Sequence, residues 1–193
     1  MPVRFLGGGG GGGGSTDVRA IIADPTLTTV AATTTETVTC VWQIPANHLL
    51  AKDSIFISLA GITTLATTVI NNTPIYKVRI GTTGTITDSL IDTIAPTFGS
   101  SNYRTKYSDV ANANVLFENL IYFNSIGASG TCRSAGRIDN KNNEANRTVS
   151  SVPDLKSNTT VDTTSLLYIS ITVTFPTTAN TFTPRTPFLS FSL

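Results

Sequence analysis

The sequence predicts an all-β protein, and three observations indicate this fold class. Between Leu166 and Phe175, apolar residues alternate with Tyr, Ser and Thr, which is the period of a strand with one buried and one solvated face. Phe188 to Leu193 repeats this alternation close to the C-terminus. No segment shows a convincing 3.6-residue apolar stripe. We therefore expect a jelly-roll-like antiparallel β-sandwich of about eight strands with an extended N-terminal arm, its sheets completed by the last segments.

Turn residues separate the remaining alternating segments. Ile44-Pro45-Ala46-Asn47 interrupts the first of them, because proline cannot donate to a strand ladder. Gly61 is expected to end the second, and Gly81 to Gly84 to form a hairpin connection. The expected strands are Thr37 to Gln43, Ser54 to Ala60, Tyr76 to Ile80, Thr85 to Ile91, Val115 to Ile126 and Thr131 to Ile138.

Two of these expectations concern burial and loops. Val115 to Ile126 is the longest hydrophobic stretch and is expected to be the most buried strand. Residues 95–113 and 139–158 are rich in Ser, Asn, Gly and charged residues, and both are expected to be long loops. Residues 20–32 are expected to contribute at most one short strand or to line a sheet edge.

The chain divides into an arm at residues 1–16, an extended linker at 17–36 and a β-sandwich domain at 37–193. Eight consecutive glycines follow a short apolar tip, and such a run gives neither a helix nor a sheet anything to pack. We expect a tether that anchors the tip in a partner, and the alternative is an arm lying on its own domain. The expected anchoring residues are Val3, Arg4, Phe5, Leu6 and the glycines from Gly7 to Gly14.

The composition favours a subunit over a free monomer. Charged residues make up 13% of the chain, about half of the usual share of roughly 25%, and 34 threonines supply polarity instead. A surface poor in charge is poorly protected against association. The net charge of +1 gives no reason to expect a nucleic acid partner. We expect no membrane insertion, and the absence of a secretory h-region predicts synthesis in a cytoplasm.

The sequence offers few residues for catalysis. His48, the only histidine, lies in the Pro-Ala-Asn turn and is expected to be structural, since no nucleophile elbow is present. Cys40 and Cys132 are expected to be buried free thiols, with a disulfide as the less favoured alternative. The scattered carboxylates give little support to a glycosidase pair. We expect no enzyme activity, no metal and no cofactor.

One segment interleaves aromatic and basic residues. Tyr103, Arg104, Lys106 and Tyr107 lie within five consecutive positions, and such side chains stack on sugars or bases while pairing with anions. Arg133 to Arg147 is also basic but contains acidic interruptions. Three interpretations remain for both segments: subunit contact, which we favour, a solvated loop, or ligand binding.

The order of strand and turn residues resembles a β-sandwich module of tailed-phage virion proteins. The similar residues are Val41 to Leu50 (VWQIPANHLL), Asp53 to Gly61 (DSIFISLAG), Lys77 to Gly81 (KVRIG) and Ile126 to Thr131 (IGASGT). The resemblance covers about residues 37–193 and includes the Thr-rich terminal strands, and its motifs are structural, not catalytic. It implies a virion component, usually trimeric, of tail fibres, tail tips or capsid decorations. The apolar tip and poly-glycine replace the long fibre shaft of that family, which leaves the location on the particle open.

The expected function is therefore that of a structural virion protein. It would be a homotrimeric β-sandwich knob attached to the particle through its arm, as a capsid decoration or a short fibre or tail component. Its partners would be copies of itself and other virion proteins. The alternative is a receptor-binding module that recognises a host surface glycan or protein through loops 100–107 and 138–158.

Overall fold

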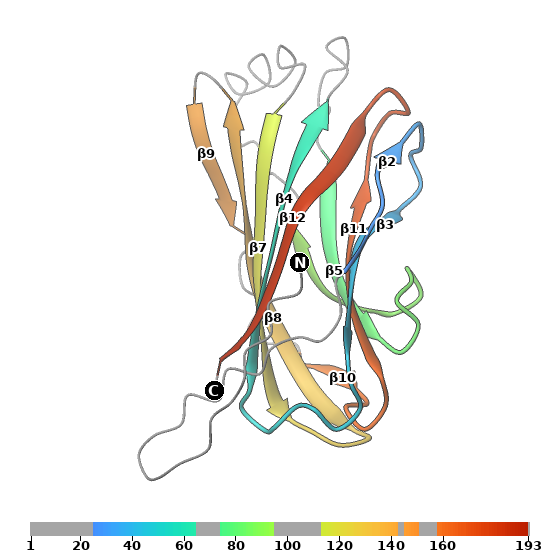
Figure 1. The fold of residues 1–193 in the computed structure, drawn as a ribbon, viewed down its shortest axis with the longest axis vertical. Helices are drawn as coiled ribbons and strands as arrows, with labels where there is room; N and C mark the ends of the chain where they lie inside the picture. Colours follow the sequence, from blue (N-terminus) through green and yellow to red (C-terminus); the bar gives the residue numbers. More distant parts are fainter. Residues whose placement is uncertain (1–24, 65–73, 95–112, 143–144, 151–157, 193) are drawn as a thin grey trace, which may run out of the picture.

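The computed structural model describes residues 25–64, 74–94, 113–142, 145–150 and 158–192. Within these ranges all regular structure is β-strand, in two antiparallel sheets that face each other (Figure 1). The all-β prediction is confirmed. The N-terminal arm and residues 17–24 of the linker lie outside the described residues. The described part of the linker contains two short strands, Thr26–Leu27 and Val30–Ala31, where the sequence predicted one at most.

The first sheet contains five strands in the order β1-β3-β11-β5-β6. Its members are β1 (Thr26–Leu27), β3 (Thr37–Ile44), β5 (Ile75–Gly81), β6 (Ser89–Ile94) and β11 (Leu167–Thr174). The second sheet has the order β10-β8-β7-β4-β12-β2, with β9 also paired to β8. Its members are β2 (Val30–Ala31), β4 (Ser54–Thr64), β7 (Ala113–Ser125), β8 (Gly130–Asn142), β9 (Ala145–Ser150), β10 (Thr159–Val161) and β12 (Thr181–Ser192).

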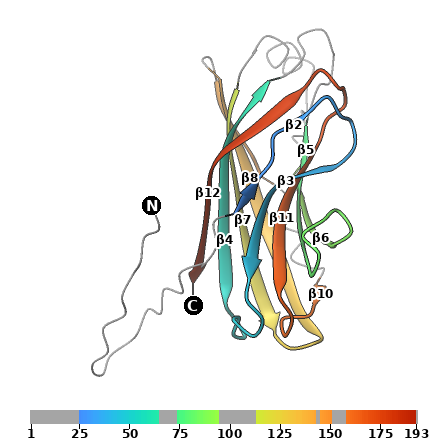
Figure 2. The same ribbon diagram turned by 45° about the vertical axis from the view of Figure 1, so that its right-hand side comes forward.

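Eight of these strands follow the jelly-roll order. In one sheet β3, β11, β5 and β6 are neighbours, and in the other β2, β12, β4 and β7 are neighbours. The chain crosses to the opposite sheet at every step between these eight, except for the β5–β6 hairpin (Figure 2). The strands β8, β9 and β10 are an addition between β7 and β11 that widens the second sheet. The last two long strands, β11 and β12, each belong to one of the two sheets, which agrees with the expectation that the last segments complete the sheets.

The core fills the space between the two sheets. Every second residue of β4 and β5 is buried, because successive side chains of a strand point to opposite faces. The largest fully buried side chains are Trp42, Tyr76, Phe117, Phe123, Phe175 and Phe182. The ring of Tyr76 meets that of Phe182 edge-on at 5.5 Å, and its hydroxyl is 3.0 Å from the Thr63 hydroxyl. The Tyr76 hydroxyl is therefore hydrogen-bonded although its ring is buried.

Several strand boundaries differ from the prediction. Strand β4 runs through Gly61 to Thr64, and β12 begins at Thr181 and continues through two prolines. The segment expected to continue the hairpin strand from Thr85 instead forms a loop that returns to the sheet at Ser89. Residues 139–158 are not one long loop, because β8 extends to Asn142 and pairs there with β9. Because both paired segments are polar, no apolar alternation in the sequence indicated that they are strands.

Burial on β11 also differs from the prediction. Ser170 and Thr172 are fully buried although they face away from the core, where the sequence predicted a solvated face. Ser170 lies opposite Val41 and Arg79 in the two neighbouring strands. The cluster around Glu36 described below covers Thr172. Strand β11 is therefore covered on both sides.

Three connections are joined at one end of the sandwich. The backbone N–H of Asn47 donates to the carbonyl of Thr163, and Thr163 N–H donates to the carbonyl of Gly127. The Thr163 hydroxyl in turn accepts from Gly127 N–H at 2.7 Å. The β3–β4, β7–β8 and β10–β11 connections thus form one hydrogen-bonded unit.

Candidate functional site

The candidate site is the outward side of the second sheet, where β8, β7, β4 and β12 lie side by side (Figure 1). Ile55, Ile57 and Leu59 of β4 point into the core, so the alternate positions of β4 and their partners point outward. We call this surface the outer face. Its residues are Phe56, Ser58 and Ala60 of β4, Leu116, Glu118, Leu120 and Tyr122 of β7, Arg133, Ala135 and Arg137 of β8, and Phe188 of β12.

The centre of the outer face is apolar and exposed. Phe56 lies directly opposite Leu120 in the β4–β7 ladder, and Phe188 lies opposite Ser58 in the β4–β12 ladder. The rings of Phe56 and Phe188 are 6.4 Å apart and tilted. Phe188 is 52% exposed and Leu120 is 46% exposed. A cluster of exposed aromatic and aliphatic side chains that is bordered by charged residues is typical of an interaction surface.

Charged side chains border this apolar centre and are held in place. The guanidinium of Arg137 donates to the carboxylate of Glu118. The guanidinium of Arg133 lies over the ring of Tyr122 at 5.3 Å from its centroid, within cation–π distance. Arginine and aromatic residues are the types enriched at protein interfaces. The outer face therefore has interface-like composition around its apolar centre.

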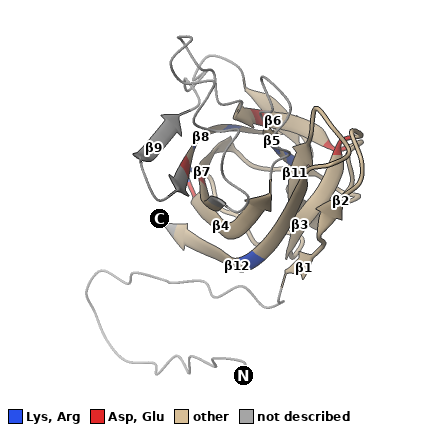
Figure 3. Ribbon diagram, turned by 90° about the horizontal axis from the view of Figure 1, so that it is seen from above, with Lys and Arg blue, Asp and Glu red and all other residues tan. Residues whose placement is uncertain are grey.

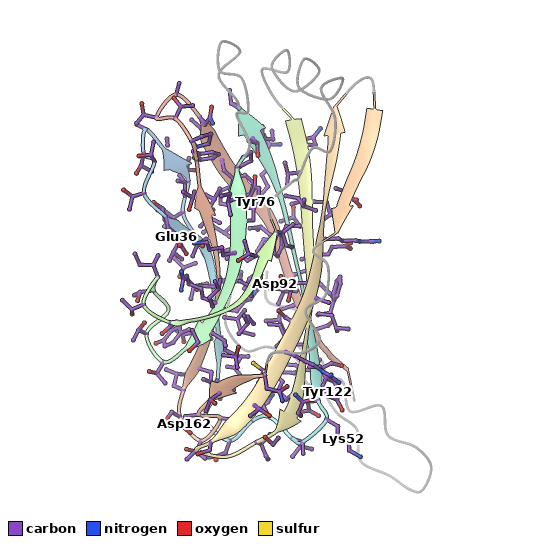
Figure 4. All side chains as sticks on the ribbon, turned by 180° about the vertical axis from the view of Figure 1, so that it is seen from behind. Glu36, Lys52, Tyr76, Asp92, Tyr122 and Asp162 are labelled. Carbon is purple, nitrogen blue, oxygen red and sulfur yellow. The ribbon has the colours of Figure 1, made fainter. Side chains whose placement is uncertain are left out.

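The first sheet carries an ionic cluster on its outward side. Glu36, just before β3, accepts from Arg79 Nε at 2.6 Å, from Lys77 Nζ at 2.6 Å and from the Thr172 hydroxyl at 2.7 Å. Burial alone would raise the pKa of Glu36, but these hydrogen bonds outweigh it and lower the pKa from an ordinary 4.5 to about 2. Arg79 also donates to the carbonyl of Asp88 at 2.8 Å. The cluster joins three segments distant in sequence, which is a structural role. Figure 4 shows Glu36 at the margin of the molecule and Tyr76 inside it.

Another acidic residue has a structural role in the loop between β5 and β6. The carboxylate of Asp88 accepts from the backbone N–H groups of Thr83 and Gly84 and from the Thr83 hydroxyl. Because these donors occupy both oxygens, the group holds the loop in place. No cluster of three or more metal-ligating side chains occurs among the described residues.

A polar contact also crosses between the sheets at the β6 edge. The amide of Asn119 on β7 donates to the carboxylate of Asp92 on β6 at 2.6 Å, and the Ser134 hydroxyl of β8 donates to the carbonyl of Ile91 at 2.8 Å. Asn119 is 1% exposed. These bonds close the sandwich on the side where β6 approaches β8, again as structural contacts.

The structure places three of the residues that the sequence analysis considered for chemistry. Cys40 and Cys132 are free and buried, as expected, and burial raises the pKa of both thiols, to about 12 for Cys132. The imidazole of His48 packs edge-on against Phe191 at 5.3 Å. The described residues contain no helix long and apolar enough to cross a membrane.

The other predicted site residues are not placed. The anchoring residues Val3, Arg4, Phe5, Leu6, Gly7 and Gly14 lie outside the described residues. Tyr103, Arg104, Lys106 and Tyr107, the expected ligand or subunit contacts, lie outside them as well. Arg133 of the second basic segment is placed, on the outer face.

Sequence reasoning missed the outer face, although a signal was present. In Ser54–Thr64 and Ala113–Ser125, the positions between the core residues are also partly apolar, for example Phe56 and Leu120. The strand expected to be the most buried is therefore buried on one side only, since Leu120 is nearly half exposed. A strand that is apolar on both faces indicates either a covered sheet or a face that meets a partner.

No protein-family model matches this chain, and the search of curated proteins found no match.

Proposed function

We propose that this chain is a structural virion protein of a tailed phage, a homotrimeric β-sandwich knob attached to the particle through its N-terminal arm. The outer face carries this proposal, because it exposes Phe188 and Leu120 beside the partly buried Phe56, although the fold has a separate buried core between its two sheets. Such a face is suited to association with other subunits. The proposed place on the particle is a capsid decoration or a short fibre or tail component.

Three further features support a structural role. Figure 3 shows that charged residues are few along the strands, so the described surface has little of the charge that keeps monomers apart. The acidic residues Glu36 and Asp88 are occupied by hydrogen bonds that hold loops and strands. The strand and turn residues that resemble phage virion modules lie at the β3–β4 connection and the β7–β8 turn, that is, in the framework of the fold.

The test is the presence of the chain in purified particles and its dependence on the arm. We expect the full chain to be a stoichiometric component of the virion, in a multiple of three copies. We expect a chain without residues 1–14 to fold with an unchanged melting temperature but to be lost from particles. Absence of the full chain from purified virions would refute the proposed function. Full incorporation of the truncated chain would refute the anchoring role alone.

The receptor-binding alternative makes a different prediction. Replacing Tyr103 and Tyr107 with Ala would leave incorporation intact and abolish adsorption of the phage to its host. Unchanged adsorption would favour the structural role. Among the described residues, the exposed Leu50, Ile126 and Leu166 belong to the joined β3–β4, β7–β8 and β10–β11 connections. These connections lie at the opposite end of β8 from Asn142, so they would give such a module a rigid apolar end that is separate from residues 138–142.

A further inference from the structure

We infer that the outer face is the surface on which a second copy of this chain packs, with Phe188 and Leu120 at the centre of the contact. The inference rests on the proposed homotrimer and names the surface that holds it together. It concerns only the contact between subunits; attachment to the particle is still proposed to occur through the N-terminal arm.

The size of the outer face fits a subunit contact. Four strands at about 4.8 Å spacing and six residue steps at about 3.4 Å, from the register of Tyr122 to that of Leu116, span roughly 19 by 20 Å, or roughly 400 Å² in projection. Projecting side chains enlarge the accessible area toward the roughly 800 Å² per partner of a stable interface. A small-molecule site would be concave and smaller. The extended outer side of the sheet therefore suits a protein surface.

The charges on the outer face favour a copy of the same chain as the partner. In a closed trimer the outer faces of the three copies would line the threefold axis, so the charges on one face lie near the same charges on its copies and a face with a strong net charge would repel them. Here the two cations Arg133 and Arg137 are accompanied by the anions Glu118 and Asp139, the outward residue opposite Leu116. The arginines are also already ordered by Glu118 and the Tyr122 ring, so fewer side-chain rotamers are lost on binding.

The adjoining sheet edge gives independent support. Strand β12 pairs with β4 along its length, but on its other side β2 pairs only with Thr181 and Phe182 among the described residues. The edge from Thr183 onward is therefore unpaired within this part of the chain, and Phe188 borders it. Exposed edges of this length are usually covered in native proteins. Pro184 and Pro187 lie on this edge and lack the N–H that strand addition needs. The copy is thus expected to pack through side chains and not to extend the sheet.

The experiment measures the mass of the full chain in solution by light scattering after gel filtration, from 1 to 100 µM. The wild-type chain should be a trimer. The double variant Phe188→Ser, Leu120→Ser should be monomeric over the whole range, which corresponds to at least 100-fold weaker association. The matched control is Leu90→Ser on β6, since Leu90 is similarly exposed at 44% but lies on the other sheet. It should remain a trimer.

A second variant guards against misfolding of the first. Ala60→Glu places a charge on the outer face without removing any packed side chain, and it should dissociate the trimer while its circular dichroism and core melting stay native. A trimer that survives both the double variant and Ala60→Glu would overturn this inference but leave the homotrimer of the proposed function standing. Equal dissociation by Leu90→Ser would also overturn it. A wild-type chain that is monomeric at 100 µM would overturn both this inference and the homotrimer. A chain that binds only a different virion protein through this face would do the same. In both cases the virion role would still be decided by incorporation into particles.

Discussion

Gly61 shows how a single residue is fixed by its neighbours in space. It lies within β4, opposite Pro184 and Val115 in the adjacent strands. A Cβ added there would lie 2.5 Å from the ring carbons Cε2 and Cζ of Phe182 and 2.9 Å from the carbonyl oxygen of Thr183. We predict that Gly61→Ala lowers the free energy of unfolding by about 1–3 kcal/mol, the usual cost of overpacking. Urea denaturation of the purified chain measures this.

Replacing the ring of Phe182 with a smaller side chain tests whether the clash causes the predicted loss of stability. Phe182→Leu removes the atoms that the new Cβ would meet, at the cost of a smaller core side chain. If the clash is with the ring, the double variant Gly61→Ala, Phe182→Leu will be more stable than the sum of the two single losses allows. Strict additivity would show that the ring is not what requires glycine at this position.

The two thiols give a second prediction at this scale. Cys40 and Cys132 are fully buried, and burial raises the pKa of both, so that little thiolate exists at neutral pH. We predict that a thiol reagent at pH 8 labels neither cysteine until the chain unfolds, and labels both in denaturant. Thr82→Cys, at an exposed loop position, is the control and should react within minutes. Rapid labelling of the native wild-type chain would contradict the observed packing.

The sequence predicted which residues are buried better than it predicted which residues they contact. Alternation placed Trp42, Cys40 and Ile171 in the core correctly, because the strand period alone determines which side chains share a face. It did not predict why glycine occupies position 61, because the ring of Phe182 is 121 residues further along the chain. Such a requirement arises from tertiary packing and has no local signature.

Among the elements, the ionic cluster of Glu36 links the start of β3 to β5 and β11. The pKa of the Glu36 carboxyl in the folded chain is about 2, below the ordinary 4.5. A depressed carboxyl pKa contributes stability that is fully present above about 4.5 and is lost as the pH falls toward 2. The difference corresponds to a contribution of roughly 3 kcal/mol at neutral pH. We predict that Glu36→Gln lowers stability at pH 7 and flattens the decline between pH 4.5 and 2.

Thermal melts from pH 7 to 2 measure this effect. Glu118→Gln is the control, since Glu118 pairs with Arg137, whose side chain is 55% exposed. Because Glu118 lies on the outer face, the variants and their reference are compared in the Phe188→Ser, Leu120→Ser background. Exposed ion pairs contribute little, so this variant should follow the wild-type acid profile. If Glu36→Gln loses stability between pH 4.5 and 2 as steeply as the wild type, other carboxylates are responsible for the acid sensitivity.

Thr163 provides an element-scale test at the joined end of the sandwich. It is 4% exposed, and its hydroxyl accepts the Gly127 N–H at 2.7 Å. Thr163→Val keeps the shape of the side chain but leaves the part-buried Gly127 N–H without this acceptor, so we predict a loss of about 1–3 kcal/mol in unfolding free energy. The control Thr160→Val, at an exposed strand position, should change it little. Equal effects of the two variants in urea titrations would refute the role of this hydrogen bond.

The elements themselves were only partly predictable. Apolar alternation revealed β3, β5 and β11, and turn residues located most of their ends. Strand β9 and the last part of β8 were missed because their residues are polar, and their pairing depends on the backbone ladder. The prolines of β12 suggested a connection before Phe188. They are tolerated inside a strand because, within the part of the chain that the structure describes, β12 has no second partner strand from Thr183 onward, and because a bulge lies between Pro184 and Thr186.

At the scale of the whole molecule, the scarcity of charged residues and the apolar outer face both indicate that the chain is a subunit. The sequence predicted a subunit from composition but could not place the contact, because its residues come from four strands spread between residues 56 and 188. Only the sheet order brings Phe56, Leu120 and Phe188 together. A contact surface assembled from alternate positions of distant strands becomes visible only once their pairing is known.

If copies of the chain stabilise one another, the melting temperature must depend on protein concentration. For a trimer that dissociates on unfolding, each tenfold increase in concentration adds about 1 kcal/mol of apparent stability per chain. For a chain of this length, 1 kcal/mol shifts the melting temperature by about 2–4 °C. We therefore predict a rise of about 2–4 °C per decade for the wild type, measured by calorimetry between 1 and 100 µM. Phe188→Ser, Leu120→Ser should melt at one temperature throughout. A wild-type melting temperature that does not move with concentration would mean that the folded chain gains nothing from its copies, and the exposed rings would need a different partner.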